Sequence, residues 1–496
     1  MKQVKNNNLL ASIAVFAELC NTEKNIQGIL TSFIKSVFVF EKIWAPINSV
    51  EMTLALKKHF DFDLPEAVVR TCLNDLAKNG FAVKKKGRYS ITDTSYNVAA
   101  FEKQLFAKKS KQEIIEGELV SHCESLLKTK VSDADRKALI DEFISYLLDE
   151  AGVSEKYSTV ISSFVIKSEK DDFILELNQI KEGVVLLTGL GYTDDLDNIG
   201  LWSEELTIYL DTEHLFNSEG YNGKLYEKLF DDFFTLVKEI NGVAQKKYSK
   251  RLIHLKFFEE IGEEVKGFFR AAEKIIRKEG NTLPESIAME EICKGCVQIS
   301  DIIKKKTIFE TNLRTRGITV KEGVDPYRIP EYNIGDASLI EKYQGQFEEK
   351  HIVYALRLLT KINLLRKGVN EENLEKCKHI ILTGKTITRQ LSMDLDIKNK
   401  KKDIPLATDI YFITNYLWYK LNKGLTKGNI LPSTLDVVTK ARIVLASQVN
   451  KPIGKKYNEI QSDLKAGKMD RKQAQDLYYN LRERELKSLK TLTLTT

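Results

Sequence analysis

The amino-acid sequence predicts an α/β protein with large all-helical portions and several domains. Its 496 residues exceed the length of a usual single domain. Only 8 prolines occur, and Lys, Leu, Glu and Ile are abundant, which favours helices. Up to about residue 205 apolar residues recur every three or four positions, whereas strand-like and helical patterns alternate from residue 206 to about 450. Such alternation is typical of a mainly parallel sheet.

The first predicted module covers residues 1–95 and ends in a basic hairpin. Helical patterns stop at Gly80, and "FAVKKKGRYSITD" follows as two short strands around a tight turn. Residues 40–95 resemble a winged helix-turn-helix. The resemblance places four candidate nucleic-acid contacts on the wing: Lys84, Lys85, Lys86 and Arg88. A protein-contact or dimer module remains open, because the helix in the recognition position carries few basic residues.

The sequence of residues 96–205 predicts an all-helical connector, and that of residues 451–496 predicts a charged helical tail. The net charge of +6 arises from 76 basic and 70 acidic residues, an excess that permits nucleic-acid binding without requiring it. The run "IKNKKKD" adds three candidate phosphate contacts, Lys400, Lys401 and Lys402. A lysine run is also common on solvated surfaces, so both interpretations stay open.

The cysteines and apolar runs predict a cytoplasmic protein without a membrane partner. The six cysteines are scattered, the N-terminal stretch lacks a signal-peptide pattern, and no run approaches the ~20 apolar residues needed to cross a bilayer. Free thiols in a reducing compartment are therefore expected. Cys293 and Cys296, in "CKGC", have metal or redox spacing. Because no second pair accompanies them, we expect two thiols on a continuous amphipathic helix.

Acidic residues follow two of the predicted strands. Asp211 comes directly after "LTIYL", and Glu259 and Glu260 come after "RLIHLKFF". In a parallel sheet the carboxyl ends of the strands meet at one edge, where active residues lie. Clustered carboxylates repel each other unless a cation lies between them, and Mg²⁺ or Mn²⁺ prefers such oxygen ligands. The alternative is local: Asp211 would be a helix N-cap, and the glutamates would be first-turn acids favoured by the helix dipole.

Four segments of this region resemble a PIN-like metal-dependent nuclease domain. They are "IYLDTEHLF", "HLKFFEEIGEEV", "EEKHIVYALRLLTKINLLRKG" and "KCKHIILTGKTIT". The resemblance implies a PIN-like parallel-sheet domain over residues 206–450. It implies metal ligands at Asp211 and at Glu260 or its neighbour Glu259, and a third acid at Glu349, which is otherwise a surface residue.

The remaining acidic positions of that family are less regular in this chain. Glu348 is an alternative third acid. At the fourth position, where the family commonly has Asp or Asn, this chain has Gly384 and Lys385. Asp409 or Asp336 would substitute for the fourth acid, or Lys385 would contact a phosphate directly.

The resemblance implies metal-dependent hydrolysis of phosphodiester bonds, in RNA more than in DNA. A bacterial toxin or anti-phage effector would suit this combination of domains, and a homo-oligomer or protein partner would use the winged-helix-like module. The irregular fourth position supports a second hypothesis, a non-catalytic nucleic-acid-binding regulator or adaptor with a degenerate nuclease domain. A P-loop ATPase is not indicated, because His379 stands where that loop requires its first glycine.

Overall fold

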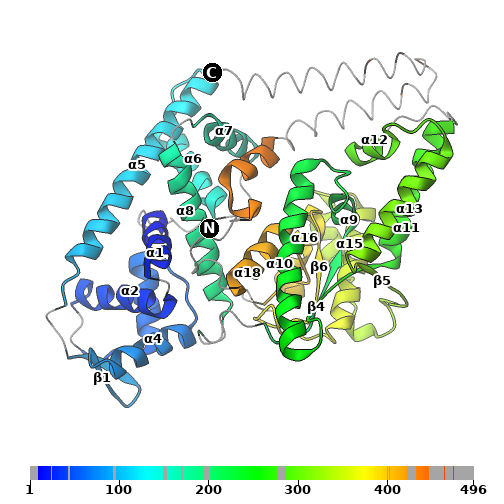
Figure 1. Cartoon of the computed structure of the whole chain (residues 1–496). Helices are drawn as coiled ribbons and strands as arrows, with labels where there is room; N and C mark the ends of the chain where they lie inside the picture. The colour runs from blue at the N-terminus through cyan, green and yellow to red at the C-terminus, as the bar shows by residue number, and fades with distance from the viewer. Residues whose placement is uncertain are drawn as a thin grey trace. The chain divides into compact units, whose positions relative to one another are not determined.

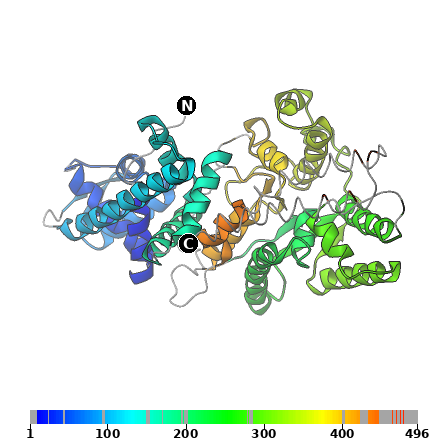
Figure 2. The same cartoon turned by 90° about the horizontal axis from the view of Figure 1, so that it is seen from above.

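The computed structural model describes two compact units of the chain (Figure 1, Figure 2). The described residues are 9–23, 25–42, 45–92, 96–148, 154–168, 171–193, 196, 202–277, 279, 286–398, 400, 403–421, 432–445, 463, 468, 473 and 477. Among the described residues, the first unit comprises those of Met1–Leu201 and Trp418–Gln448, and the second comprises those of Trp202–Leu417 and Val449–Leu489. Residues 418–421 and 432–445, which the sequence analysis assigns to the sheet domain, therefore belong to the first unit.

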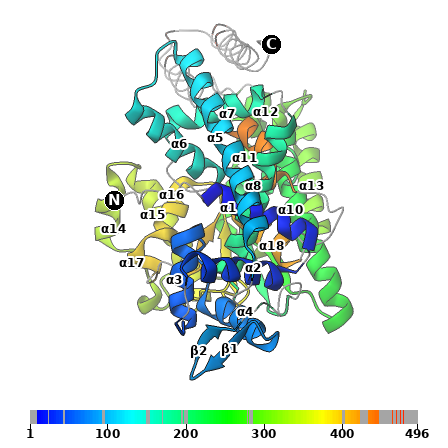
Figure 3. The same cartoon turned by 90° about the vertical axis from the view of Figure 1, so that its left-hand side faces the viewer.

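The first unit begins with four helices and a hairpin: α1 (Leu9–Glu23), α2 (Ile26–Phe40), α3 (Ser49–Phe60), α4 (Glu66–Lys78), β1 (Ala82–Lys85) and β2 (Arg88–Ile91). Asn48 and Glu51 form a capping box that starts α3. The antiparallel strands β1 and β2 are joined through Lys86 and Gly87, which have positive φ angles of 51° and 76°. Two-residue hairpin turns require such angles. The predicted hairpin is therefore present, next to α4 (Figure 3).

The rest of the first unit is helical: α5 (Ala99–Leu127), α6 (Asp133–Leu147), α7 (Glu155–Lys167), α8 (Asp171–Gly191) and the 3-10 turn η4 (Ser433–Leu435). Two glycines let α8 approach its neighbours closely. A Cβ on Gly183 would lie 2.5 Å from the Ile13 carbonyl oxygen, and one on Gly189 would lie 2.4 Å from the Tyr419 ring. The Tyr419 hydroxyl also lies 3.0 Å from that of Thr193. These contacts attach the segment around Tyr419 to the first unit.

The second unit contains a parallel sheet whose described strands are β3 (Leu206–Leu210), β4 (Ile253–Phe258), β5 (Thr319–Lys321), β6 (His379–Leu382) and β7 (Ala407–Thr408). Their order in the sheet is β5-β4-β3-β6-β7. The strands β4 and β5 lie on one side of β3, and the later strands β6 and β7 lie on its other side. β3 is central and mostly buried, as expected for a parallel strand covered on both faces. Ligands of open parallel sheets bind where the strand order reverses.

Helices surround this sheet: α9 (Thr212–Asn217), α10 (Lys224–Tyr248), α11 (Glu259–Arg277), α12 (Ile287–Cys293), α13 (Ile299–Thr315), η2 (Pro330–Tyr332), α14 (Ala337–Gln344), α15 (Glu349–Leu365), α16 (Thr386–Met393), α17 (Leu395–Lys398) and α18 (Ile410–Lys420). The predicted class, a mostly helical α/β protein with a parallel sheet, is confirmed. Within the described ranges, every helix is too short or too polar to serve as a membrane span.

One local prediction is wrong. The sequence around "CKGC" predicts a continuous helix, but α12 ends at Cys293 and α13 begins at Ile299. Gly295 between them adopts a positive φ of 70°, which glycine tolerates and which interrupts a helix. Cys293 and Cys296 are free thiols, as are the other four cysteines.

Candidate active site

The central strands β3 and β6 end side by side where the strand order reverses. β3 is followed by Asp211, and β6 by Thr383, Gly384 and Lys385. The parallel register extends past the strands, since the Asp211 N–H donates to the Leu382 carbonyl oxygen at 3.0 Å. The residues that follow the two strands are therefore neighbours at the carboxyl edge of the sheet.

Asp211 is the buried centre of this edge, with 1% of its surface exposed. Its Oδ1 accepts a hydrogen bond from the Thr212 N–H at 2.8 Å, and Asp211 is the N-cap of α9. Its Oδ2 accepts a hydrogen bond from the Thr383 hydroxyl at 2.7 Å. The Lys385 ammonium lies 3.2 Å from Oδ1. The same carboxylate thus caps a helix, which is one of the two roles that the sequence analysis weighs, and it also forms an ion pair with a lysine.

Lys385 also approaches a second carboxylate, on the helix that follows β4. Its Nζ lies 3.8 Å from Glu264 Oε2 and 5.0 Å from the centre of the Tyr354 ring. The Tyr354 hydroxyl is 3.5 Å from the same Glu264 oxygen. Sequence reasoning identified neither Glu264 nor Tyr354. A signal for Glu264 exists, because it stands four positions after Glu260 and therefore on the same face of α11.

Glu260 contacts a second lysine. The Lys361 ammonium donates to Glu260 Oε2 at 2.6 Å and lies 5.0 Å from the centre of the Phe258 ring. The other oxygen, Glu260 Oε1, is buried without a hydrogen-bond partner. Glu259 is exposed and accepts a hydrogen bond from the Gly323 N–H at 3.2 Å. Of the two adjacent glutamates, Glu260 is therefore the one that contacts α15, which carries Lys361.

Tyr354 is influenced by all three carboxylates. Burial raises the pKa of its hydroxyl above the usual range, and the negative charges of Glu264, Asp211 and Glu260 raise it further. The hydroxyl therefore stays protonated and can donate a hydrogen bond. Three positive side chains lie among these acids: Lys361 pairs with Glu260, Lys385 pairs with Asp211, and the Arg357 guanidinium lies 5.3 Å from the centre of the Tyr354 ring.

The remaining predicted acids make other contacts. Glu349 is exposed at the start of α15 and lies 3.5 Å from the Gln344 side-chain amide. Asp409 follows β7, accepts a hydrogen bond from the Phe412 N–H at 2.9 Å and pairs with Arg389 at 3.0 Å. It therefore starts α18 and neutralises an arginine. The two alternatives also have local roles: Asp336 caps α14, and Glu348 pairs with Lys350.

The predicted basic residues on the hairpin have mixed surroundings. Lys84 donates to the Asn74 side chain at 2.9 Å, and Arg88 pairs with Glu51 at 2.8 Å. Both are therefore engaged within the first unit. The two side chains between them in sequence are exposed, Lys85 and Lys86.

The second lysine run is only partly described. The Lys400 ammonium pairs with Glu372 at 3.2 Å, and its backbone N–H donates to Asp403 at 3.0 Å. Lys401 and Lys402 lie outside the described residues. Within this run, the described contacts are those of a surface ion pair.

Gly384 lies in close contact with a glutamate side chain in the turn after β6. A Cβ at this position would lie 2.1 Å from Glu213 Oε1 on α9. Glu213 Oε1 is also 3.1 Å from Nε2 of the buried His214. The absence of a side chain at Gly384 thus allows α9 to contact the turn that carries Lys385.

The donor chemistry at this edge fits a hard divalent cation. Asp211 and Glu264 supply carboxylate oxygens that lie 3.2 Å and 3.8 Å from the Lys385 ammonium. Mg²⁺ commonly uses only one or two protein carboxylates and completes its shell with water and substrate phosphate. Over the described ranges, no group of three or more His, Cys, Asp or Glu side chains is arranged to hold a metal ion.

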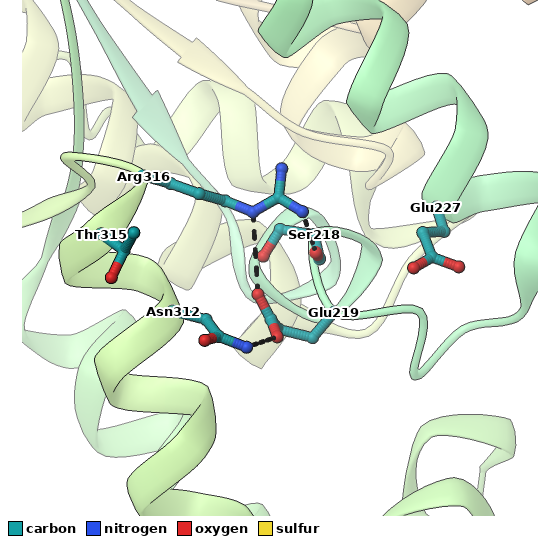
Figure 4. Close-up of a pocket in the computed structure, with 6 residues that line it drawn as sticks. All are labelled: Ser218, Glu219, Glu227, Asn312, Thr315 and Arg316. Atoms are coloured by element: carbon teal, nitrogen blue, oxygen red, sulfur yellow. Dashed lines mark hydrogen bonds and ion pairs between the residues drawn. The ribbon is translucent and has the colours of Figure 1, made fainter.

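A polar cavity of about 370 Å³ lies elsewhere in the second unit (Figure 4). Its lining residues are Ser218, Glu219, Glu227, Asn312, Thr315 and Arg316. Asn312 donates to Glu219 at 2.6 Å, and Arg316 donates to the Ser218 carbonyl oxygen at 3.0 Å. Arg316 also pairs with Asp231 at 2.9 Å. These groups largely satisfy one another and link α13 to the segment after α9.

Comparison of the chain with protein-family models, curated proteins and solved structures gives no match. The fold and the site nevertheless define a class. This is an α/β protein whose parallel sheet carries acidic and basic side chains at its reversal point, where such sheets bind ligands.

Proposed function

We propose that the second unit is a metal-dependent nuclease that hydrolyses phosphodiester bonds, with Mg²⁺ or Mn²⁺ as its cofactor. The observation that carries this proposal is the pair of carboxylates, Asp211 and Glu264, that surrounds one positive charge at the carboxyl edge of the sheet. RNA is the favoured substrate because the four segments around this edge resemble a PIN-like nuclease domain.

In this proposal Asp211 and Glu264 hold the divalent cation. The Thr383 hydroxyl and the Thr212 N–H fix the orientation of the Asp211 carboxylate, so its oxygens are positioned before any ligand arrives. When bound, such a cation would lower the pKa of a water molecule and stabilise negative charge on phosphate oxygens. Glu260 adds negative charge nearby, and Lys361 limits the repulsion among the acids.

The basic and aromatic side chains would bind the nucleic acid. Lys385 is 35% exposed on its side chain, and an ammonium is a suitable partner for a phosphate oxygen. Exposed Lys85 and Lys86 on the hairpin of the first unit are further candidates for backbone contacts. Phosphate contacts of this kind position a nucleic acid without reading its sequence.

A second candidate is a non-catalytic nucleic-acid-binding regulator or adaptor. One observation favours it: lysines already neutralise Asp211 and Glu260, and Asp409 at the end of β7 is occupied by Arg389. A degenerate nuclease domain would keep its basic side chains and lose its metal ligands. Binding without cleavage would then be its whole activity.

We also propose a cellular role as a toxin or anti-phage effector, because the combination of domains expected from the sequence suits such a role. Cleavage of cellular RNA would arrest the growth of cells that express the chain. Growth curves of cells expressing the wild type and Asp211→Asn would test this role. Equal growth of both cultures would count against it.

The direct test is cleavage of labelled RNA and DNA in Mn²⁺ by the full-length chain. Wild type should cleave, and Asp211→Asn should lose at least about a hundredfold in rate, because the group that holds the cation is gone. Glu205→Gln is a suitable control, since Glu205 precedes β3 at the opposite edge and pairs with the exposed Lys250. If the wild type binds RNA but cleaves nothing, the regulator hypothesis replaces the nuclease.

A further inference from the structure

We propose that Lys385 is a built-in occupant of the cation site, which a divalent cation must displace before the site can act. This inference rests on the proposed function, because it concerns the same two carboxylates. The Lys385 Nζ lies 3.2 Å from Asp211 and 3.8 Å from Glu264. The face of the Tyr354 ring lies 5.0 Å away. Two carboxylates and an aromatic ring are thus arranged around a single positive charge.

The buried Asp211 carboxylate needs a positive partner whether or not a metal ion is bound. Asp211 is 1% exposed, and a carboxylate this deeply buried is costly without a positive partner. The hydrogen bonds from Thr383 and Thr212 satisfy its oxygens but do not cancel its charge. Departure of Lys385 is therefore favourable only when another cation takes its place, so the two cations exchange one for one.

The side chain of Lys385 can move away from the carboxylates, whereas its main chain is fixed by a hydrogen bond. Its backbone N–H donates to the Thr383 hydroxyl oxygen at 3.1 Å, which anchors the residue at the start of α16. The lysine arm is flexible and partly exposed, so it can leave the carboxylate without moving the main chain. Exchange for another cation keeps Asp211 paired with a positive charge, and it frees a positive side chain next to the place where a phosphate would bind.

The charges select a divalent cation. Asp211 and Glu264 carry two negative charges, of which Lys385 neutralises one. A divalent cation neutralises both, whereas a monovalent cation only equals the lysine that it would replace. We therefore expect Mn²⁺ or Mg²⁺ to displace Lys385 and Na⁺ or K⁺ to leave it in place.

The test is Mn²⁺ binding to the full-length chain, measured by calorimetry and by the electron paramagnetic resonance of free Mn²⁺. Lys385→Met should bind Mn²⁺ about three- to tenfold more tightly than wild type, since the competing cation is absent. Lys250→Met is the control, because Lys250 pairs with a single exposed carboxylate, Glu205, at 2.8 Å. Its Mn²⁺ affinity should equal that of wild type.

The outcomes separate this inference from the nuclease proposal. Tighter Mn²⁺ binding by Lys385→Met supports the inference even if no variant cleaves RNA. Equal or weaker binding overturns it, even if the wild type proves to be a nuclease that depends on Asp211. Addition of Asp211→Asn to Lys385→Met should abolish the tight binding, and retention of tight binding would also overturn the inference. Absence of Mn²⁺ binding in every variant would contradict both proposals.

Discussion

Two lysine–carboxylate pairs lie at the carboxyl edge of the sheet, and they differ in how the lysine is buried. Lys361 is 9% exposed on its side chain and lies 2.6 Å from Glu260. Lys385 is 35% exposed and lies 3.2 Å from Asp211. The ammonium of a buried lysine cannot reach another negative group, whereas that of a partly exposed lysine can leave its carboxylate and bind a phosphate. The same chemistry therefore supports the fold in one pair and a replaceable cation in the other.

The largest difference between the pairs should appear in stability. Lys361→Met should lower the free energy of unfolding by about 3 kcal/mol, because it leaves Glu260 mostly buried without its partner. Lys385→Met should lower it by less, about 1–2 kcal/mol, because the Thr383 hydroxyl and the Thr212 N–H still donate to the buried Asp211 carboxylate. Urea unfolding measures both values. The double variant Lys361→Met with Glu260→Gln should recover most of the loss, and equal losses for the two lysines would remove the distinction.

A smaller effect should follow from the turn that holds Lys385. Gly384→Ala places a Cβ 2.1 Å from Glu213 Oε1, the end of a flexible side chain that is 36% exposed, so we expect a loss of about 1 kcal/mol or less. Glu213→Ala removes the obstacle, so the double variant should lose less stability than the sum of the single variants. Thermal unfolding of the four proteins measures this coupling. Strict additivity would show that the turn and α9 do not pack as described.

The last effect, which is absent at neutral pH, concerns the opposite end of β6. Burial and the nearby positive charge of Arg366 lower the pKa of His379 from 6.5 to about 4. Between about pH 6.5 and pH 4, His379 is therefore protonated in the unfolded chain and neutral in the folded chain. The free energy of unfolding falls as the pH drops through this window. His379→Gln should flatten that part of the stability profile in acid titrations followed by circular dichroism. An unchanged profile would rule out this histidine as a contributor.

The alternation of strands and helices predicted part of the site. It placed Asp211 and Glu260 at one edge, and "HIILTGKT" placed Lys385 there as well. Each of these residues directly follows a strand or begins the helix after it, so strand order suffices to bring them together. Lys385 was expected to face a phosphate, whereas in the structure it pairs with carboxylates.

The rest of the site depends on helix packing. Glu264, Tyr354 and Lys361 lie one or more turns inside α11 and α15, and tertiary packing decides which turn reaches the edge. For that reason the third acid was expected at Glu349, although α15 contributes a tyrosine and a lysine to the cluster instead. The assignment of Tyr419 to the first unit rests on a similarly distant contact, with Gly189.

The most direct measurement is anomalous scattering from Mn²⁺ in crystals of the full-length chain. The proposed function predicts a manganese peak between Asp211 and Glu264, at the position that the Lys385 ammonium now takes, with the lysine turned away. A structure in saturating Mn²⁺ without a peak there, and with Lys385 still bound to Asp211, would contradict it.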